Sequence, residues 1–140
     1  MSENNVMPAR FRFVKYLITE ASIKLTGRTL GKDVQFGIHP DGELKKEEKI
    51  FLLIMKVLIK DDENNLDFSM SIEGVFEYEI DDLQELIPFI CENAPAILFP
   101  YIRAYISNIT ALSGMSPIIL PTLNIKRVGE ELIDKINTAN

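Results

Sequence analysis

The feature that most limits the fold is the alternation of apolar and polar side chains along residues 66–80. One parity carries Leu66, Phe68, Met70, Ile72, Phe76, Tyr78 and Ile80, and the other carries Asp67, Ser69, Ser71, Glu73, Glu77 and Glu79. Because successive side chains of a strand point to opposite faces, this pattern predicts a long strand with one buried and one wet face. After Ile80 the apolar period becomes helical, with Asp81 or Asp82 as the N-cap. We therefore expect a sheet followed by helices.

Three segments before this run have the composition of strands. Residues 11–25 are rich in β-branched and aromatic side chains, and residues 50–60 are apolar on both parities, as suits a central strand. A shorter strand at 33–38 is expected to end in a turn at 39–42. Residues 61–65 join the last two strands as an antiparallel hairpin.

The first strand has an irregular alternation. One parity holds Phe11, Phe13, Leu17, Ala21, Ile23 and Leu25. Val14, Tyr16 and Ile18 fall on the other parity, so both faces are apolar near the middle of the strand. We expect the second apolar face to meet another subunit.

The main helix is predicted over residues 94–113, with Asn93 as a second N-cap and Gly114 as the C-terminal stop. Its apolar side chains form two lines, Ile97, Tyr101 and Tyr105 in one and Leu98, Ile102, Ile106 and Ile109 in the other. A small sheet covers one side of such a helix, so the other side requires a partner, most simply a second copy. An obligate oligomer is expected, with Ile97, Tyr101, Ile102, Tyr105 and Ile109 at its interface.

Residues 115–125 form a proline-punctuated segment that is too apolar for a free loop and must lie on the rest of the molecule. A closing amphipathic helix is predicted over about 126–137. The 140 residues suit one domain, 1–140, in which residues 1–9 and 138–140 are expected to be flexible.

Composition excludes several classes of protein. The formal charge of −6 disfavours a nucleic-acid partner, because a phosphate backbone would be repelled. The single cysteine, Cys91, cannot form an intramolecular disulfide, and the first residues lack the pattern of a secretory signal. No apolar run approaches the roughly 20 residues that span a bilayer. These observations predict a cytoplasmic protein without membrane insertion.

The sequence offers no catalytic, metal or cofactor site. His39 has no second histidine or nearby cysteine, and Cys91 is interpreted as a small buried hydrophobe. The glycines do not form a phosphate-binding loop, and residues 61–67 resemble a calcium loop except that Leu66 replaces the required glycine. We therefore expect no enzyme, no cofactor and no metal.

The segment Ala94-Pro95-Ala96-Ile97-Leu98-Phe99-Pro100-Tyr101-Ile102-Arg103 resembles the helix signature of SecB, the bacterial protein-export chaperone. The proline-rich segment 115–124, the short helix after it and Gly74-Val75-Phe76 are also similar to SecB, in the same order. The resemblance implies an α+β fold, with a four-stranded antiparallel sheet followed by a long helix and a short C-terminal helix. It also implies a homotetramer built as a dimer of dimers.

The same resemblance implies a holdase that binds unfolded or precursor polypeptides without ATP. The implied client-binding residues are Phe36, Phe68, Met115, Ile118, Ile119, Leu120 and Leu123. From the residues alone, these side chains could equally belong to the core.

Docking of the translocation motor SecA would fall on Glu20 and Asp67, by analogy with acidic and apolar positions on the outer sheet face of the family. Lys24 stands where the family has an acid, and Ser69 replaces a carboxylate, so weak or absent SecA binding is expected. Two alternatives to export stay open. One is a SecB-like chaperone dedicated to a single partner such as an antitoxin, and the other is a non-catalytic ligand-binding or scaffold protein on the same fold.

Overall fold

Four strands precede the helices, as the change of period predicts. The computed structural model describes residues 10–26 and 29–139, with side chains as far as residue 136. The elements are β1 (Phe11–Leu25), β2 (Val34–Lys45), β3 (Ile50–Asp61), β4 (Leu66–Tyr78), α1 (Leu83–Pro88), the π-helical turn η2 (Phe89–Asn93), α2 (Ala94–Leu112) and α3 (Ile125–Ala139). The predicted flexible residues 1–9 and 140 lie outside the described part, and α3 continues two residues beyond its predicted end.

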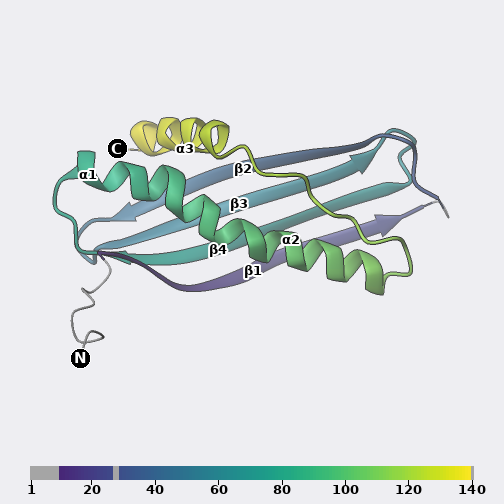
Figure 1. Cartoon of the computed structure of the whole chain (residues 1–140), viewed down its shortest axis with the longest axis horizontal. Helices are drawn as coiled ribbons and strands as arrows, with labels where there is room; N and C mark the ends of the chain where they lie inside the picture. The colour runs from purple at the N-terminus through teal and green to yellow at the C-terminus, as the bar shows by residue number, and fades with distance from the viewer. Residues whose placement is uncertain (1–9, 27–28, 140) are drawn as a thin grey trace, which may run out of the picture.

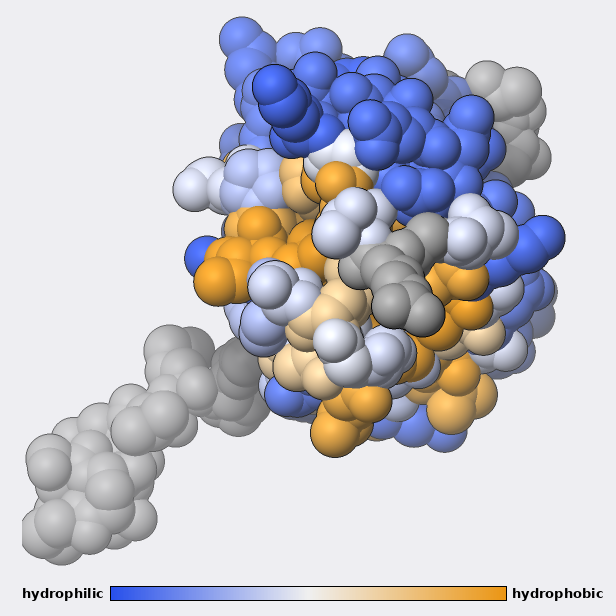
Figure 2. Space-filling model, turned by 90° about the vertical axis from the view of Figure 1, so that its right-hand side faces the viewer, coloured by the Kyte–Doolittle hydropathy of each residue, from blue (hydrophilic) through white to orange (hydrophobic). Residues whose placement is uncertain are grey.

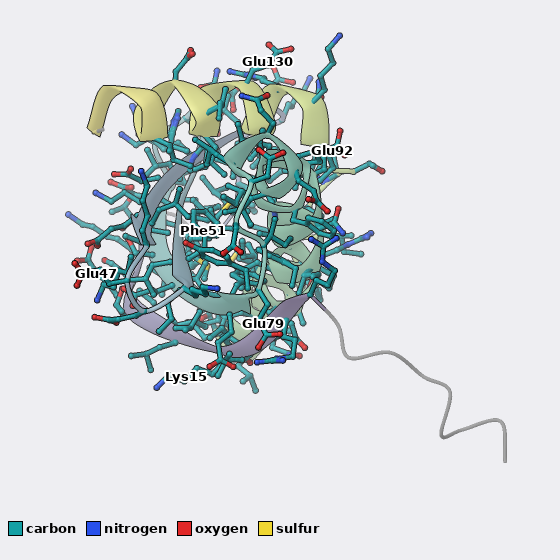
Figure 3. All side chains as sticks on the ribbon, turned by 90° about the vertical axis from the view of Figure 1, so that its left-hand side faces the viewer. Lys15, Glu47, Phe51, Glu79, Glu92 and Glu130 are labelled. Atoms are coloured by element: carbon teal, nitrogen blue, oxygen red, sulfur yellow. The ribbon has the colours of Figure 1, made fainter. Side chains whose placement is uncertain are left out.

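The strands form one antiparallel sheet in the order β1-β4-β3-β2, which confirms the expected fold class. Figure 1 shows α2 lying diagonally across one face of the sheet and α3 lying beside β2. The core fills the space between them, and Phe51, Met55 and Phe68 there are fully buried. In Figure 3, Phe51 lies inside the molecule, whereas Glu47 and Glu130 point away from it.

A buried carboxylate fixes the crossover from β1, at one edge of the sheet, to β2, at the other. Asp61 is 4% exposed, and its carboxylate accepts the N–H groups of Gly31 (2.7 Å), Asn65 (2.7 Å) and Leu66 (2.9 Å). Burial alone would raise the pKa of Asp61, but these donors stabilise the charged form and lower it. The single side chain thus ties the crossover to the β3–β4 hairpin.

The turn predicted at residues 39–42 is wrong, because β2 continues as a strand to Lys45. His39 pairs with Lys56 and Pro40 with Met55 in the ladder to β3. Proline lacks an N–H donor, so it is tolerated in a strand only at an edge or a bulge. Since β2 is an edge strand, the missing N–H of Pro40 breaks no hydrogen bond between β2 and β3. The turn falls at Lys46–Lys49 instead.

The parity predicted for β1 is also wrong in its middle. Register shifts occur between Phe13 and Lys15 and between Ile18 and Glu20, as at β-bulges. Tyr16 and Ile18 consequently share the face that packs on α2, while Leu17 turns to the opposite face with 63% of its surface exposed. An inserted residue exchanges the two faces of a strand, and alternation alone cannot locate it.

The helices begin as predicted but are joined differently. The Asp82 side chain accepts the N–H of Gln84 (3.0 Å), which confirms it as the N-cap of α1. Asn93 makes no capping hydrogen bond, because the chain passes through η2 into α2 without leaving helical geometry. Gly114 follows α2 with φ 89°, as a C-terminal stop requires. No helix among the described residues is long and apolar enough to cross a membrane.

Candidate functional site: an apolar pocket beside an open strand edge

Two hydroxyl groups on α2 hold the extended segment 115–124, here called the connecting segment. The N–H of Ile118 donates to Thr110 Oγ1 (3.0 Å), and Ser107 Oγ donates to the carbonyl of Ile118 (2.9 Å). Thr110 is fully buried and also donates to the carbonyl of Ile106 (2.7 Å). Both backbone groups of Ile118 are therefore satisfied, and the segment is held as a fixed wall over the sheet.

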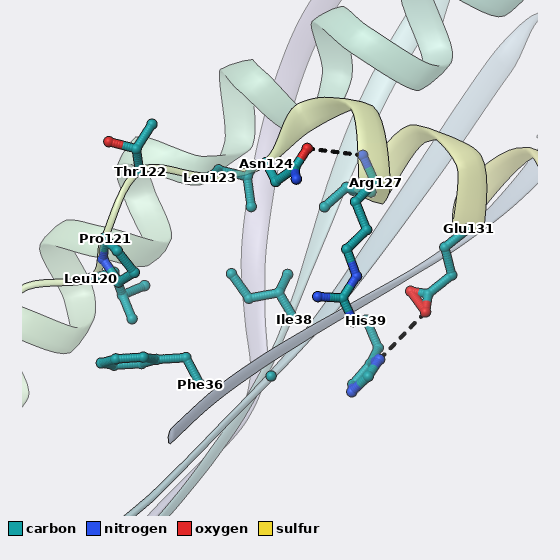
Figure 4. Close-up of a pocket in the computed structure, with 12 residues that line it drawn as sticks. Phe36, Ile38, His39, Leu120, Pro121, Thr122, Leu123, Asn124, Arg127 and Glu131 are labelled. Atoms are coloured by element: carbon teal, nitrogen blue, oxygen red, sulfur yellow. Dashed lines mark hydrogen bonds and ion pairs between the residues drawn. The ribbon is translucent and has the colours of Figure 1, made fainter. Parts of the chain in front are cut away.

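A pocket of about 200 Å³ lies between this wall and β2. Figure 4 shows its apolar part, with Phe36 and Ile38 of β2 opposite Leu120 and Leu123 of the connecting segment. Phe36 is 38% exposed, so its ring is accessible from outside the molecule. We call this hollow the β2 pocket. Its shape and lining suit an apolar side chain of another molecule.

The strand edge beside the β2 pocket is open over a short stretch. Antiparallel partners alternate between bonded and non-bonded pairs, and the N–H of Asp62 donates to the carbonyl of Asp33 (3.0 Å). The odd-numbered residues of β2 therefore bond to β3, and even-numbered residues such as Phe36 and Ile38 turn their backbone groups outward. Those groups can accept an added strand.

Beyond Ile38 the same edge is blocked. Pro40 has no N–H, and its carbonyl accepts a hydrogen bond from Lys135 Nζ of α3 (2.7 Å). The N–H of Gly42 donates to the carboxylate of Asp41 (2.8 Å). An added strand can therefore pair at Phe36 and Ile38 but cannot continue along β2.

Of the residues predicted to bind clients, some are accessible from outside the molecule and the others are buried in the core. Phe36 and Leu123 line the β2 pocket, Ile119 is 65% exposed and Met115 is half-buried. Phe68, Ile118 and Leu120 belong to the core, although Leu120 also contributes to the pocket wall.

A second hollow of about 570 Å³ lies at the other end of the connecting segment. Leu25, Leu30 and Met115 contribute to its lining. Nearby in sequence, Leu112 at the end of α2 is 87% exposed. Figure 2 shows hydrophobic patches at this end of the molecule. Apolar surface thus lies at both ends of the connecting segment.

The predicted oligomer-interface residues lie on α2 in two environments. Ile102 is fully buried against the sheet, whereas Tyr101 is 39% exposed and Ile97, Tyr105 and Ile109 are half-buried. The ring of Tyr101 lies tilted against that of Tyr16 of the edge strand β1, with 4.5 Å between ring centroids. On the line formed by Ile97, Tyr101 and Tyr105, Tyr101 therefore forms an exposed aromatic pair with Tyr16 of β1.

Glu20 and Asp67, predicted for SecA docking, are both exposed on the sheet face away from α2, here called the outer face. In the strand register Asp67 lies between Lys24 of β1 and Lys60 of β3. The carboxylate of Asp67 thus has a cation on each side. The outer face at this end is consequently less acidic than the sequence of β4 alone suggests.

Cys91 and His39, the residues considered above for catalysis or metal binding, both contact other elements of the fold. Cys91 is 9% exposed in the core, and burial raises the pKa of its thiol. His39 lies in β2 with its Nδ1 3.5 Å from Glu131 Oε1 of α3. Among the residues that the structure describes, no group of three or more His, Cys, Asp or Glu could hold a metal ion.

Sequence reasoning missed the polar residues that shape the pocket. Ser107 and Thr110 bond to a residue 11 and 8 positions away, and Lys135 reaches a carbonyl 95 positions away. The sequence signal was weak: Ser107 and Thr110 are polar interruptions in an apolar helix, and such residues favour bonds to backbone groups. Lys135 had no distinguishing signal.

The family model described as preprotein translocase subunit SecB matches residues 33–131. An uncharacterized protein of Methanocaldococcus jannaschii is 34% identical over 119 residues, which cover 75% of this chain and 77% of that protein. The protein-export protein SecB of Jannaschia sp. is 29% identical over 122 residues, which cover 81% of this chain and 71% of that protein.

Among solved structures, a SecB-like chaperone of Mycobacterium tuberculosis in complex with a ChAD peptide from the HigA1 antitoxin has a similar fold. The TM-score is 0.69 at 14% identity, and the match covers 81% of this chain and 91% of that chain. At this identity the likeness concerns the fold.

Proposed function

The chain belongs to the SecB family, as its resemblance predicts, and on that premise we propose that it is a holdase for unfolded polypeptides. Membership of this family supports a chaperone role. The finer proposal is that the chain acts without ATP in the cytoplasm and binds clients as extended segments through the β2 pocket and the connecting segment.

The observation that carries the proposal is the combination of an apolar pocket with open backbone groups at its rim. Phe36 and Ile38 offer apolar side chains to the pocket and backbone donors and acceptors at the strand edge. An unfolded chain has both complements, namely apolar side chains and unpaired backbone groups. Backbone pairing is independent of sequence, so many clients fit.

The energetics agree with reversible holding. Full burial of one large apolar side chain is worth about 1.5–3 kcal/mol, from which the ordering of the client must be subtracted. Several contacts along the connecting segment are therefore needed for useful affinity. Because the chaperone binds unfolded and not folded chains, mass action keeps clients unfolded without ATP.

The proposal is tested by the aggregation of a chemically denatured client after dilution, measured by light scattering with stoichiometric chaperone. We expect the wild-type chain to delay aggregation and Phe36→Ser to lose most of the effect. Leu58→Ser is the matched control, because Leu58 is 44% exposed against 38% for Phe36 but lies on the outer face. Thermal melting of each variant verifies that it is folded.

Absence of any delay at excess wild-type chain would contradict holding. Equal losses in Phe36→Ser and Leu58→Ser would contradict the placement of clients in the β2 pocket. The two outcomes can be told apart, because in the second the wild-type chain still delays aggregation.

Export through SecA is a further part of the proposal, with Glu20 and Asp67 as contacts on the outer face. Lys24 and Lys60 beside Asp67 reduce the acidic character of this docking position on the outer face, so we expect SecA binding to be weak. Co-sedimentation with SecA measures it, and Lys24→Glu should strengthen it. Tight binding by the wild-type chain would contradict the weight given to Lys24.

A chaperone dedicated to one partner is the second candidate, and the same lysines favour it over export. The fold also occurs in a mycobacterial SecB-like chaperone solved with an antitoxin peptide. The breadth of clients recovered with the tagged chain separates the candidates. Many unrelated clients support a general holdase, and a single recurrent client supports a dedicated one.

A further inference from the structure

The β2 pocket has a charged end that apolar holding does not use. Figure 4 shows Arg127 and Glu131 of α3 above His39 of β2, next to the apolar part of the pocket. A pocket that only buries apolar side chains gains nothing from a guanidinium at its rim. The charges at this end therefore need an explanation of their own.

Arg127 and Glu131 stand four residues apart on α3, a spacing at which opposite charges commonly pair. Here Glu131 Oε1 lies 3.5 Å from His39 Nδ1 instead. Among the described residues, none of the ion pairs within 4.0 Å involves Arg127. Its backbone N–H donates to Asn124 Oδ1 (3.1 Å), which leaves the guanidinium free for an external anion.

The position of Arg127 coincides with the end of the open edge. A client strand paired at Phe36 and Ile38 cannot continue past Pro40, whose carbonyl is taken by Lys135. The client must turn away or end at that point, where Arg127 lines the pocket. A guanidinium binds a carboxylate with two parallel hydrogen bonds, which makes this anion its natural ligand in a polypeptide.

We propose that Arg127 binds a client carboxylate at the closed end of the β2 pocket, beside an apolar side chain that occupies the pocket. The inference rests on the proposed function and adds a local selectivity to it. The carboxylate comes from an acidic side chain or from the C-terminus of the client. The net charge of −6 repels acidic chains at long range, so the effect favours one carboxylate next to apolar residues.

The test uses three unstructured peptides with the same apolar core, and fluorescence anisotropy measures their affinity. The first peptide has Asp next to the apolar core and an amidated C-terminus. The second has Asn in place of Asp and the same amidated C-terminus, so it has no carboxylate. The third ends in Asn next to the core and has a free C-terminal carboxylate. Each is titrated with the wild-type chain, with Arg127→Gln and with Lys126→Gln. Lys126 is the matched control, because it is the neighbouring cation on α3 and does not line the β2 pocket.

We expect the wild-type chain to bind at least one carboxylate peptide about three- to fivefold more tightly than the amide-capped Asn peptide, the size of a partly exposed ion pair. The peptide that binds more tightly shows whether the carboxylate comes from a side chain or from the C-terminus of the client. In Arg127→Gln the carboxylate peptides should bind no more tightly than the amide-capped Asn peptide, whereas Lys126→Gln should retain the difference.

Equal affinity for all three peptides, or a difference that persists in Arg127→Gln, would overturn the inference while leaving the proposed function in place. Failure of every peptide to bind the wild-type chain would overturn both.

Discussion

At the scale of single residues, the buried carboxylate of Asp61 links two separate parts of the chain. Its carboxylate accepts three backbone N–H groups from the crossover and the β3–β4 hairpin while it is 4% exposed. The lowered pKa of this group means that its contribution to stability is present above the unfolded value of about 3.9. The contribution is lost as the pH falls through the lower folded value.

We therefore expect Asp61→Asn to lower the urea midpoint of unfolding at pH 7, because an amide cannot replace the charged acceptor. The deficit relative to the wild-type chain should shrink when the pH is lowered below about 4. Asp67→Asn, an exposed substitution on β4, serves as the control. A deficit that does not change with pH would contradict the role of the charge.

Thr110 is the residue on which the wall of the β2 pocket depends most. Thr110→Val keeps the shape of the side chain but leaves the buried N–H of Ile118 without its acceptor. We expect a loss of about 1–3 kcal/mol in the free energy of unfolding and weaker peptide binding. Ser113→Ala removes an exposed hydroxyl at the end of the same helix and should change stability by less than about 0.5 kcal/mol.

Residue-scale contacts were the least predictable from the sequence. Alternation identified the buried parity of β4, because one strand carries its own pattern. The bonds of Lys135 to Pro40 and of Thr110 to Ile118 depend on which elements meet, and this is set by the packing of the whole chain. The free state of Arg127 likewise follows from the contact of Glu131 with His39.

At the scale of elements, α3 packs against η2 with a very close approach at Gly129. A Cβ added at Gly129 of α3 would lie 2.8 Å from the carbonyl oxygen of Cys91, a backbone atom that cannot move aside cheaply. Glycine therefore permits α3 to approach η2 and stay beside β2, where it blocks the strand edge.

Gly129→Ala should destabilise the chain by about 1–3 kcal/mol, as overpacking does. Helix propensity alone predicts the opposite sign, a gain of about 1 kcal/mol, so denaturant unfolding discriminates between the two effects. Glu130→Ala, at the adjacent exposed position, provides the comparison. A variant more stable than the wild-type chain would show that the contact is not restrictive.

The existence and order of the elements were predictable, whereas their irregularities were not. The switch from strand to helical period at Ile80 fixed the α+β class. The extension of β2 through Pro40 was missed because the sequence does not reveal that β2 is an edge strand. The bulges of β1 were missed because they only become visible in the register with β4.

At the scale of the whole molecule, one copy leaves apolar surface uncovered. Tyr101 of α2 and Tyr16 of β1 form an aromatic pair with exposed fractions of 39% and 41% at the edge of the sheet. The single four-stranded sheet buries the line of α2 that contains Ile102 and covers the line that contains Tyr101 only in part. We propose that a second copy covers this line, and that the complete assembly is a tetramer.

Sedimentation of the wild-type chain should therefore give a mass of about four times the 15.9 kDa of one chain. The double variant Tyr16→Ser, Tyr101→Ser should sediment as a smaller species, because it loses apolar area at the interface. Leu83→Ser, which removes a side chain 42% exposed on α1, should leave the mass unchanged. A monomeric wild-type chain at all concentrations would contradict the proposed assembly.

The central claim, that unfolded polypeptides occupy the β2 pocket, is tested most directly by photo-cross-linking to a permanently unfolded client. A photoreactive residue is placed at position 36 in the pocket, and in a second variant at position 58 on the outer face. We expect the client to cross-link at position 36 and not at position 58. Cross-linking at position 58 alone, while the client remains bound, would contradict the claim.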